Sequence, residues 1–237
     1  MAAATSLAKR ARRTGARALA LAGGAALGAS HRLEAQDGDL QGDRIVEWSF
    51  CLARLAEGPG TTLDFGADVA FLSLAAAQRG HAVVALDRLP GALDYEDERV
   101  EALQADILDR PLQDRRFDQI VNCSSIEHVG LSGRYGSAEA PDGDLEAMAI
   151  LRDLLAPHGR MILTIPVGRD LVCAPKHRIY GAERLPRLLD GYQVEEDQFW
   201  RKDRDAGAWK QTDRETALET AGSASFYSLG LFVLARP

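Results

Sequence analysis

The sequence has 237 residues, of which 46% are hydrophobic, and this is enough to bury the core of one large domain. Its formal net charge of -7 argues against a nucleic-acid partner, because proteins that bind phosphates over a broad surface usually present a basic face. The three cysteines, Cys51, Cys123 and Cys173, are widely spaced. They fit neither a disulfide framework nor a set of zinc ligands, which indicates a reducing compartment.

The first 40 residues differ in composition from the rest of the chain. Basic residues between Lys9 and Arg17 precede an apolar stretch over 18–29 that is rich in alanine, leucine and glycine. This order is typical of a secretion signal, but the basic region is long and glycines dilute the apolar run. An amphipathic helix that rests on the domain or on an anionic membrane is the alternative. We expect a cytoplasmic protein with an N-terminal arm over 1–40 and a folded domain over 41–237.

Beyond the arm, the apolar pattern predicts helices and strands that alternate. In chain order, these are a helix over 44–55, a strand over 61–65, a helix over 69–78, strands over 81–86, 100–103 and 117–123, a helix over 144–155, and strands over 160–165, 192–200 and 226–234. Such alternation predicts a seven-stranded, mostly parallel, doubly wound sheet with helices on both faces. The last two strands are joined by too little chain for a standard crossover, so we expect an antiparallel strand at the C-terminal end.

Ligands of such sheets bind beyond the carboxyl ends of the strands, so the residues directly after each strand are the first candidates for a site. Gly66 follows the first strand, where glycine allows a sharp turn into a helix that offers free N–H groups; a simple turn is the alternative. Asp87 ends the second strand roughly 20 positions after Asp64, which suits hydrogen bonds to the hydroxyls of a nucleoside. Asp106, after the third strand, can accept from an adenine amine while Ile107 packs on the ring, or it can cap a helix.

Four segments resemble motifs of the class I S-adenosylmethionine-dependent methyltransferases and occur in the same order. TLDFGADVAFLSLAAAQRGHAVVALDR (62–88) resembles the first motif with its ribose-binding acid, and QADILD (104–109) resembles the acidic motif on the adenine side. FDQIVNCSSIEHV (117–129) is similar to the fourth motif, and LRDLLAPHGRMILTIPVG (151–168) to the elements after it. The segments IEHVGLSGRYG and HRIY most resemble uncharacterised bacterial members found with genes for sugar and surface-polysaccharide modification.

The resemblance implies that S-adenosylmethionine is the cofactor. The residues that match the family's cofactor-binding positions are Asp64, Gly66, Asp68, Asp87, Asp106, Ile107, Asn122 and Ser124. The family's glycine motif reads D-x-G-x-G-x-G, and this chain has Asp68 and Ala70 in place of the second and third glycines. The Asp68 carboxylate can repel the carboxylate of the cofactor or hold its ammonium group. A protein that has lost methyl transfer and binds a partner or another ligand through the same cleft is therefore the alternative interpretation.

Glu127 and His128 follow the fourth predicted strand, where the transferring methyl group would lie. Methyl transfer is an in-line displacement, so the acceptor must be oriented and a hydroxyl must lose its proton. Histidine, with an ordinary pKa near ~6.5, suits that task, and we expect His128 to be the base with Glu127 orienting it. A helix cap and a packed imidazole are the structural alternative. Metal-assisted relatives resemble E-x-x-E-H and have an acid where this chain has Ser124, so no metal is expected.

The acceptor is expected to bind between two further segments. Arg134 and Tyr135 lie in a glycine-flanked loop that can close over an acceptor. A second group follows the fifth strand and should face the same pocket: His177, Arg178 and Tyr180. Trp200 and Trp209 can stack on an acceptor or be buried in the ordinary way.

These features favour a methyltransferase that moves a methyl group from S-adenosylmethionine to an oxygen or nitrogen of a small molecule or glycan. A nicotinamide-dependent oxidoreductase is disfavoured by the poor glycine fingerprint and by the antiparallel strand expected at the end of the chain.

Overall fold

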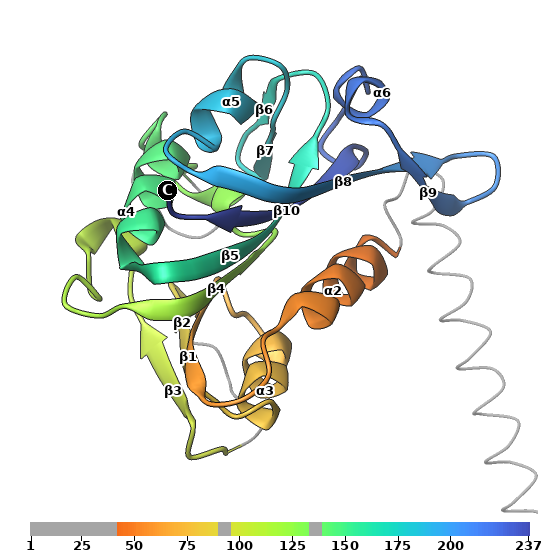
Figure 1. Ribbon diagram of the computed structural model, residues 1–237. Coiled ribbons are helices and arrows are strands. Elements are labelled where there is room, and N and C mark those ends of the chain that lie inside the picture. Colours follow the sequence, from red (N-terminus) through yellow and green to blue (C-terminus); the bar gives the residue numbers. More distant parts are fainter. Residues whose placement is uncertain (1–41, 90–95, 133–138) are drawn as a thin grey trace, which may run out of the picture. The chain divides into compact units, whose positions relative to one another are not determined.

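The computed structural model describes residues 42–89, 96–132 and 139–237, and these form a domain built around one large sheet (Figure 1). The expected arm over 1–40 lies outside the described residues. The strands are β1 (Gly60–Phe65), β2 (His81–Asp87), β3 (Val100–Gln104), β4 (Phe117–Cys123), β5 (Leu155–Val167), β6 (Leu171–Cys173), β7 (His177–Ile179), β8 (Gln193–Asp203), β9 (Ala208–Thr212) and β10 (Ser228–Ala235). The helices are α2 (Asp43–Arg54), α3 (Phe71–Gln78), α4 (Gly143–Leu154), α5 (Arg184–Leu188) and α6 (Arg214–Leu218), with short 3-10 turns η2 (Ile107–Asp109) and η3 (Ile126–His128).

The strand order of the main sheet is β3-β2-β1-β4-β5-β10-β8-β9. Strands β1 to β5 pair in parallel, and β10 runs antiparallel to both β5 and β8. The prediction of a mostly parallel sheet with an antiparallel C-terminal strand is therefore confirmed. The chain turns from one half of the sheet to the other between β1 and β4, so the carboxyl ends of these two strands border the crevice where ligands of such sheets bind.

The sheet has eight strands, and the prediction of seven was wrong. The missed strand, β9, pairs antiparallel with β8 at the edge of the sheet, and three of its five residues are exposed. An edge strand with one partner needs little apolar surface, so its sequence (AWKQT) carries no alternating pattern. The β6–β7 hairpin is a separate two-stranded sheet and was missed because each of its strands has only three residues, too few to show a pattern.

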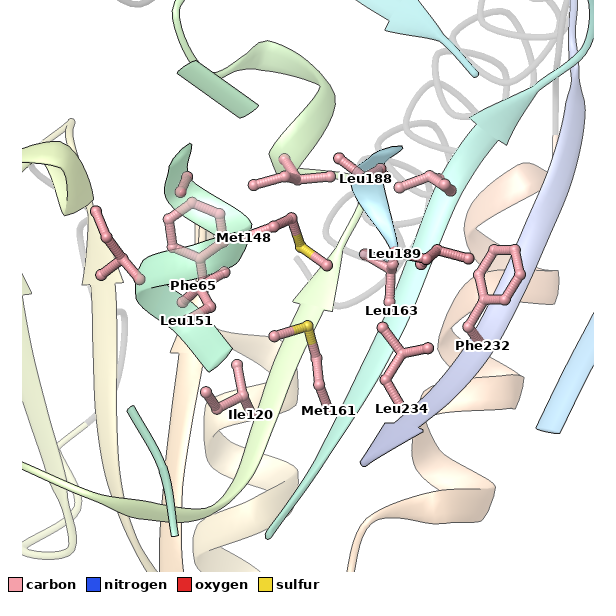
Figure 2. Close-up of a cluster of buried hydrophobic side chains, with 14 of the residues drawn as sticks. Phe65, Ile120, Met148, Leu151, Met161, Leu163, Leu188, Leu189, Phe232 and Leu234 are labelled. Carbon is pink, nitrogen blue, oxygen red and sulfur yellow. The ribbon is translucent and has the colours of Figure 1, made fainter. Parts of the chain in front are cut away.

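Helices cover both faces of the sheet, as predicted, and each face has its own apolar core (Figure 1). On one face, Met148 and Leu151 of α4 pack against Met161 and Leu163 of β5, and Figure 2 shows Phe232 of β10 in the same layer. On the other face, α2 and α3 pack against the sheet through the cluster that contains Phe50 and Leu72. Burying each of these large apolar side chains stabilises the fold by about 1.5–3 kcal/mol.

Two helix boundaries matter for the site. Helix α2 begins at Asp43 and ends at Arg54, close to the predicted range. Helix α3 begins only at Phe71, two residues later than predicted, because Asp68 and Ala70 have positive φ angles of 46° and 54°. A right-handed helix cannot include residues in this conformation. No helix within the three described segments has the length and apolar character needed to cross a lipid bilayer.

Candidate cofactor and acceptor site

The turn after β1 keeps the backbone path that the glycine motif suggests. Gly66, Asp68 and Ala70 all have positive φ angles, of 74°, 46° and 54°. This left-handed region is free of strain for glycine but costs other residues about 1–2 kcal/mol. The amide of Gly66 donates to the carbonyl of Leu86 at 2.8 Å, which ties the turn to the end of β2. The chain therefore holds a strained turn at the switch point of the sheet, and such strain is commonly found at functional sites.

Gly66 also brings the carboxyl ends of β1 and β4 together. A Cβ atom at this position would overlap the hydroxyl group of Ser125. That hydroxyl lies 3.3 Å from the carbonyl oxygen of Gly66 and 3.2 Å from that of Cys123, and it can donate to either. Glycine is thus required here for close packing as well as for its positive φ angle.

Asp87 is fixed at the carboxyl end of β2 by two backbone amides. Its Oδ2 accepts from the amide of Asp68 at 3.0 Å and its Oδ1 from the amide of Leu89 at 2.9 Å. The residue is half-buried, and each carboxylate oxygen keeps a second lone pair. The arrangement presents a preoriented acceptor for hydroxyl groups beside the turn.

Asp106 and Ile107 have mainly structural contacts. Asp106 caps η2 by accepting from the amide of Leu108 at 3.0 Å, and its other oxygen accepts from Nη1 of Arg88 at 2.9 Å. Ile107 is only 2% exposed and belongs to the core under α4. The expectation that Ile107 packs on an adenine ring is corrected, because its side chain points into the core.

Asp64 lies beneath the turn. It is 3% exposed, and its Oδ2 accepts from the hydroxyl of Ser73 at 2.6 Å. Burial raises the pKa of Asp64 to about 6, although the hydrogen bonds from Ser73 oppose the rise. Its direct role is to join β1 to α3, which positions the turn between them.

A buried carboxylate, Glu47 of α2, connects the ends of β4 and β5. Its Oε1 accepts from the hydroxyl of Ser124 in a short hydrogen bond and from Oγ1 of Thr164 at 2.9 Å, and its Oε2 accepts from Nη1 of Arg44 at 3.0 Å. Burial raises the pKa of Glu47, and the charge of Arg44 and the two hydroxyl donors oppose the rise. Asn122, also fully buried, accepts from the amide of Ile126 at 3.3 Å and so fixes the turn after β4.

The structure brings Glu127, His128 and His177 together at the end of β4. Nδ1 of His128 lies 2.5 Å from the carbonyl oxygen of Lys176, and its Nε2 lies 3.7 Å from Oε1 of Glu127. The ring of His177 packs edge-on against His128 and Tyr227, with centroid distances of 6.3 Å and 5.2 Å.

Tyr227, directly before β10, completes this group. Its hydroxyl donates to Oδ2 of Asp43 in α2 at 3.5 Å. Burial and the carboxylates of Asp43, Glu47 and Glu127 raise the pKa of Tyr227, so its phenol stays protonated and acts as a donor. One polar group is thus formed by side chains from segments far apart in the sequence: α2, η3, β7 and the residue before β10.

Arg178 and Tyr180 do not face an acceptor, which corrects the expectation from sequence. Arg178 is 1% exposed and donates to the carbonyl oxygens of Val129 at 2.6 Å and of Pro141 at 3.2 Å. Tyr180 is fully buried and donates to Asp144 at 3.0 Å. Both side chains are used to hold the segment after η3 against the start of α4.

The remaining predicted residues divide into two groups. Arg134 and Tyr135 lie outside the described residues. Trp200 and Trp209 pack on the cluster under α2 and are partly buried, which is the ordinary role that the sequence left open. Among residues 42–89, 96–132 and 139–237, no group of three histidine, cysteine or acidic side chains is placed to hold a metal ion.

A family model described as "Caenorhabditis protein of unknown function, DUF268" matches residues 76–216. The chain belongs to the DUF268 family. The match covers more than half of the chain and includes β2 to β9, but it begins after the turn that carries Asp68. No curated protein matches this DUF268 chain.

Solved structures show which fold the DUF268 domain has. The 1,6-didemethyltoxoflavin-N1-methyltransferase of Burkholderia thailandensis aligns with a TM-score of 0.56 and 19% identity over 90% of this chain and 89% of that one. The N-methyltransferase NodS of Bradyrhizobium japonicum WM9, in complex with S-adenosylhomocysteine, aligns with a TM-score of 0.57 and 17% identity over 85% and 90%. A TehB-like methyltransferase of Corynebacterium glutamicum gives 0.50 and 19% over 89% and 96%. The DUF268 domain therefore has the class I methyltransferase fold.

Sequence reasoning missed Arg44, Glu47 and Tyr227 in this DUF268 site. Glu47 had a detectable signal, because it lies three and four positions before the buried residues Phe50 and Cys51 and so shares their face of α2. A carboxylate on an otherwise apolar helix face needs a buried partner. Tyr227 had no such signal, since its neighbours come from three distant segments.

Proposed function

We propose that this DUF268 protein is a methyltransferase that moves a methyl group from S-adenosylmethionine to an oxygen or nitrogen of a small molecule or glycan. The observation that carries the proposal is the position of Asp87. Its carboxylate sits at the carboxyl end of β2 and is bonded to the amide of Asp68 in the strained turn after β1. In this fold, that edge of the sheet is where nucleotide ligands bind.

The residues around the turn fit the proposed cofactor. Asp68 is exposed, so its side chain is not packed into the turn despite replacing a glycine. Asp87 would accept from the ribose hydroxyls, and the backbone at Gly66 and Ser124 would border the methionine part. Asp68 would accept from the ammonium group. When bound, S-adenosylmethionine supplies an electrophilic methyl group on a sulfonium ion.

The structural neighbours support the same class of reaction. The Burkholderia thailandensis and Bradyrhizobium japonicum proteins are N-methyltransferases, and both were crystallised with S-adenosylhomocysteine bound. They favour a small-molecule acceptor, with a glycan as the wider class.

The group at the end of β4 supplies the proton chemistry that an acceptor needs. Nδ1 of His128 faces a carbonyl oxygen, which can only accept, so this nitrogen carries a hydrogen. Nε2 is then the ring nitrogen that takes a proton from the acceptor. Glu127, 3.7 Å away, stabilises the imidazolium that forms. His177 and Tyr227 would line the acceptor side, where the protonated phenol donates a hydrogen bond.

Calorimetric titration with S-adenosylmethionine and S-adenosylhomocysteine tests the proposal. Asp87→Ala should weaken binding of both ligands by about 1.5–3 kcal/mol, because two hydrogen bonds to a charged group are lost. Asp118→Ala is the matched control: this carboxylate accepts from Thr61 at the opposite, amino ends of β1 and β4 and should leave affinity unchanged.

If calorimetry detects no binding heat and the melting temperature does not shift with millimolar cofactor, the methyltransferase proposal is wrong. The strained turn with Asp68 would then favour the alternative, a binding module that uses the same crevice for another ligand or a partner.

A further inference from the structure

We propose that Arg44 of α2 binds the carboxylate of the cofactor's methionine part, with Glu47 as the residue that positions it. The inference rests on the proposed function and adds a residue from outside the motifs that resemble the methyltransferase family. An α-amino acid carries both charges, so a site that recognises it needs a cation for the carboxylate as well as an acceptor for the ammonium group.

The contacts of Arg44 place its guanidinium group at the end of β4. Nη1 lies 3.9 Å from Sγ of Cys123, the last residue of that strand. The carbonyl oxygen of Cys123 lies 3.2 Å from the hydroxyl of Ser125, which is itself 3.3 Å from the carbonyl oxygen of Gly66. Arg44 thus stands beside the junction of β1 and β4, which is the place proposed for the methionine part.

The guanidinium group of Arg44 is fixed by a buried carboxylate, yet its side chain remains partly exposed. Its Nη1 donates to Oε2 of Glu47 at 3.0 Å, and Glu47 is fixed in turn by Ser124 and Thr164. The side chain of Arg44 keeps 48% of its exposure, whereas that of Glu47 keeps 1%. Both hydrogen bonds described for the guanidinium group use Nη1, so among the described residues none is described for Nη2 or Nε. A guanidinium group that is fixed at one edge and open at the other suits a carboxylate.

Two other arginines of this region, Arg178 and Arg88, contact groups of the protein itself. Arg178 is buried among backbone carbonyls, and Arg88 pairs with Asp106 at the end of the crevice assigned to the adenine. The titratable side chains that act on Arg44 are Glu47, Cys123, Asp43 and Glu127, in that order. Arg44 is therefore a cation that can be offered to an anion at this place. Arg44 and the exposed Asp68 together match the two charges of an amino acid.

The test compares two ligands that differ only in the amino-acid part. S-adenosylhomocysteine carries it, and 5′-methylthioadenosine has the same nucleoside and sulfur without it. In calorimetry with the full chain, Arg44→Ala should weaken S-adenosylhomocysteine binding about tenfold or more and change 5′-methylthioadenosine binding less than about twofold. Arg44→Lys keeps the charge and should lie between Arg44→Ala and the wild type.

Three controls separate this role from a structural one. Arg54→Ala removes an arginine of the same helix that pairs with Glu196 and should affect neither ligand. Asp87→Ala should weaken both ligands. The double variant Arg44→Ala/Glu47→Gln leaves no buried charge without a partner, and its binding of 5′-methylthioadenosine and its melting temperature report whether α2 is still in place.

Equal loss of both ligands in Arg44→Ala, or loss of neither, would overturn the role of Arg44. The same holds if the wild type binds S-adenosylhomocysteine no more tightly than 5′-methylthioadenosine. If the wild type binds neither nucleoside, the proposed function itself is wrong, and the two failures are thereby distinguished.

Discussion

The backbone amide of Asp68 donates a 3.0 Å hydrogen bond to Oδ2 of Asp87. This contact joins a strained residue, with a φ angle of 46°, to the acid at the end of β2. The contact thereby ties the turn after β1 to the carboxyl end of the neighbouring strand β2. The same contact leaves the Asp68 carboxylate exposed beside the crevice. The position where the glycine motif of the class I methyltransferases has glycine therefore presents a charge in this chain.

We expect Asp68→Gly to weaken S-adenosylhomocysteine binding severalfold and to leave 5′-methylthioadenosine binding unchanged, because in the proposed site the carboxylate would contact only the ammonium group. Glycine adopts a positive φ angle without strain, so the melting temperature should stay level or rise. Ala70→Gly is the matched control, since Ala70 has a φ angle of 54° and no charge. Tighter binding in Asp68→Gly would show that the carboxylate obstructs the cofactor instead.

Asp64 gives a prediction about pH and stability. Burial raises its folded pKa to about 6, above an unfolded value of roughly 3.9. The folded state then binds the proton more tightly, so the stabilising contribution is complete below pH ~4 and is lost as the pH rises through about 6. Asp64→Asn mimics the protonated form. Its free energy of unfolding should exceed that of the wild type by about 2 kcal/mol at pH 7.5, and the difference should shrink toward pH 4.

Denaturant unfolding at several pH values measures that difference. A constant gap between Asp64→Asn and the wild type from pH 4 to pH 7.5 would show that Asp64 ionises normally in the folded protein.

The arrangement of the sheet followed from sequence because β1, β2, β4 and β5 are largely buried on both faces, and β2 and β5 contain clear apolar runs. The end of each strand could then be located, which placed Gly66, Asp87 and His128 at the correct edge. Strand β9 gave no such signal, because exposed edge residues carry no apolar pattern. The boundary between arm and domain stays a prediction.

The direction of each side chain could not be obtained in the same way. Arg178 and Tyr180 follow the expected strand, yet both point into the protein toward Asp144. Which face of a short strand is buried depends on what packs over it, and here that is the start of α4. Glu47 shows the converse case, because its partners Ser124, directly after β4, and Thr164 on β5 lie about 80 and 120 positions away in sequence and meet it only in the folded chain.

Arg178 yields a prediction that separates a structural from an acceptor-binding role. Arg178→Ala should lower the free energy of unfolding by about 3–5 kcal/mol, because it leaves buried carbonyl groups without their donor and removes one of the two arginines that pair with the buried Asp144. Arg184 also contacts Asp144 but is more exposed, so Arg184→Ala should cost less. Urea unfolding measures both. A stable Arg178→Ala protein that loses only acceptor affinity would restore the role expected from sequence.

The last prediction concerns His128 and requires an acceptor, which radiolabelled methyl transfer to candidate small molecules and glycans would identify. If Nε2 of His128 takes the proton of a hydroxyl acceptor, His128→Ala should lower kcat by ~10²–10⁴ and leave the affinity for S-adenosylhomocysteine nearly intact. The wild-type rate should rise with pH, since only the neutral imidazole accepts a proton. Glu127→Gln should reduce kcat less, because the amide still fills the site but no longer stabilises the imidazolium. An amine that arrives deprotonated needs no base, and the loss of kcat in His128→Ala would then be much smaller.

His177→Ala should mainly raise KM, given its packing against Tyr227 on the proposed acceptor side. Full turnover in His128→Ala together with none in His177→Ala would place the base on β7.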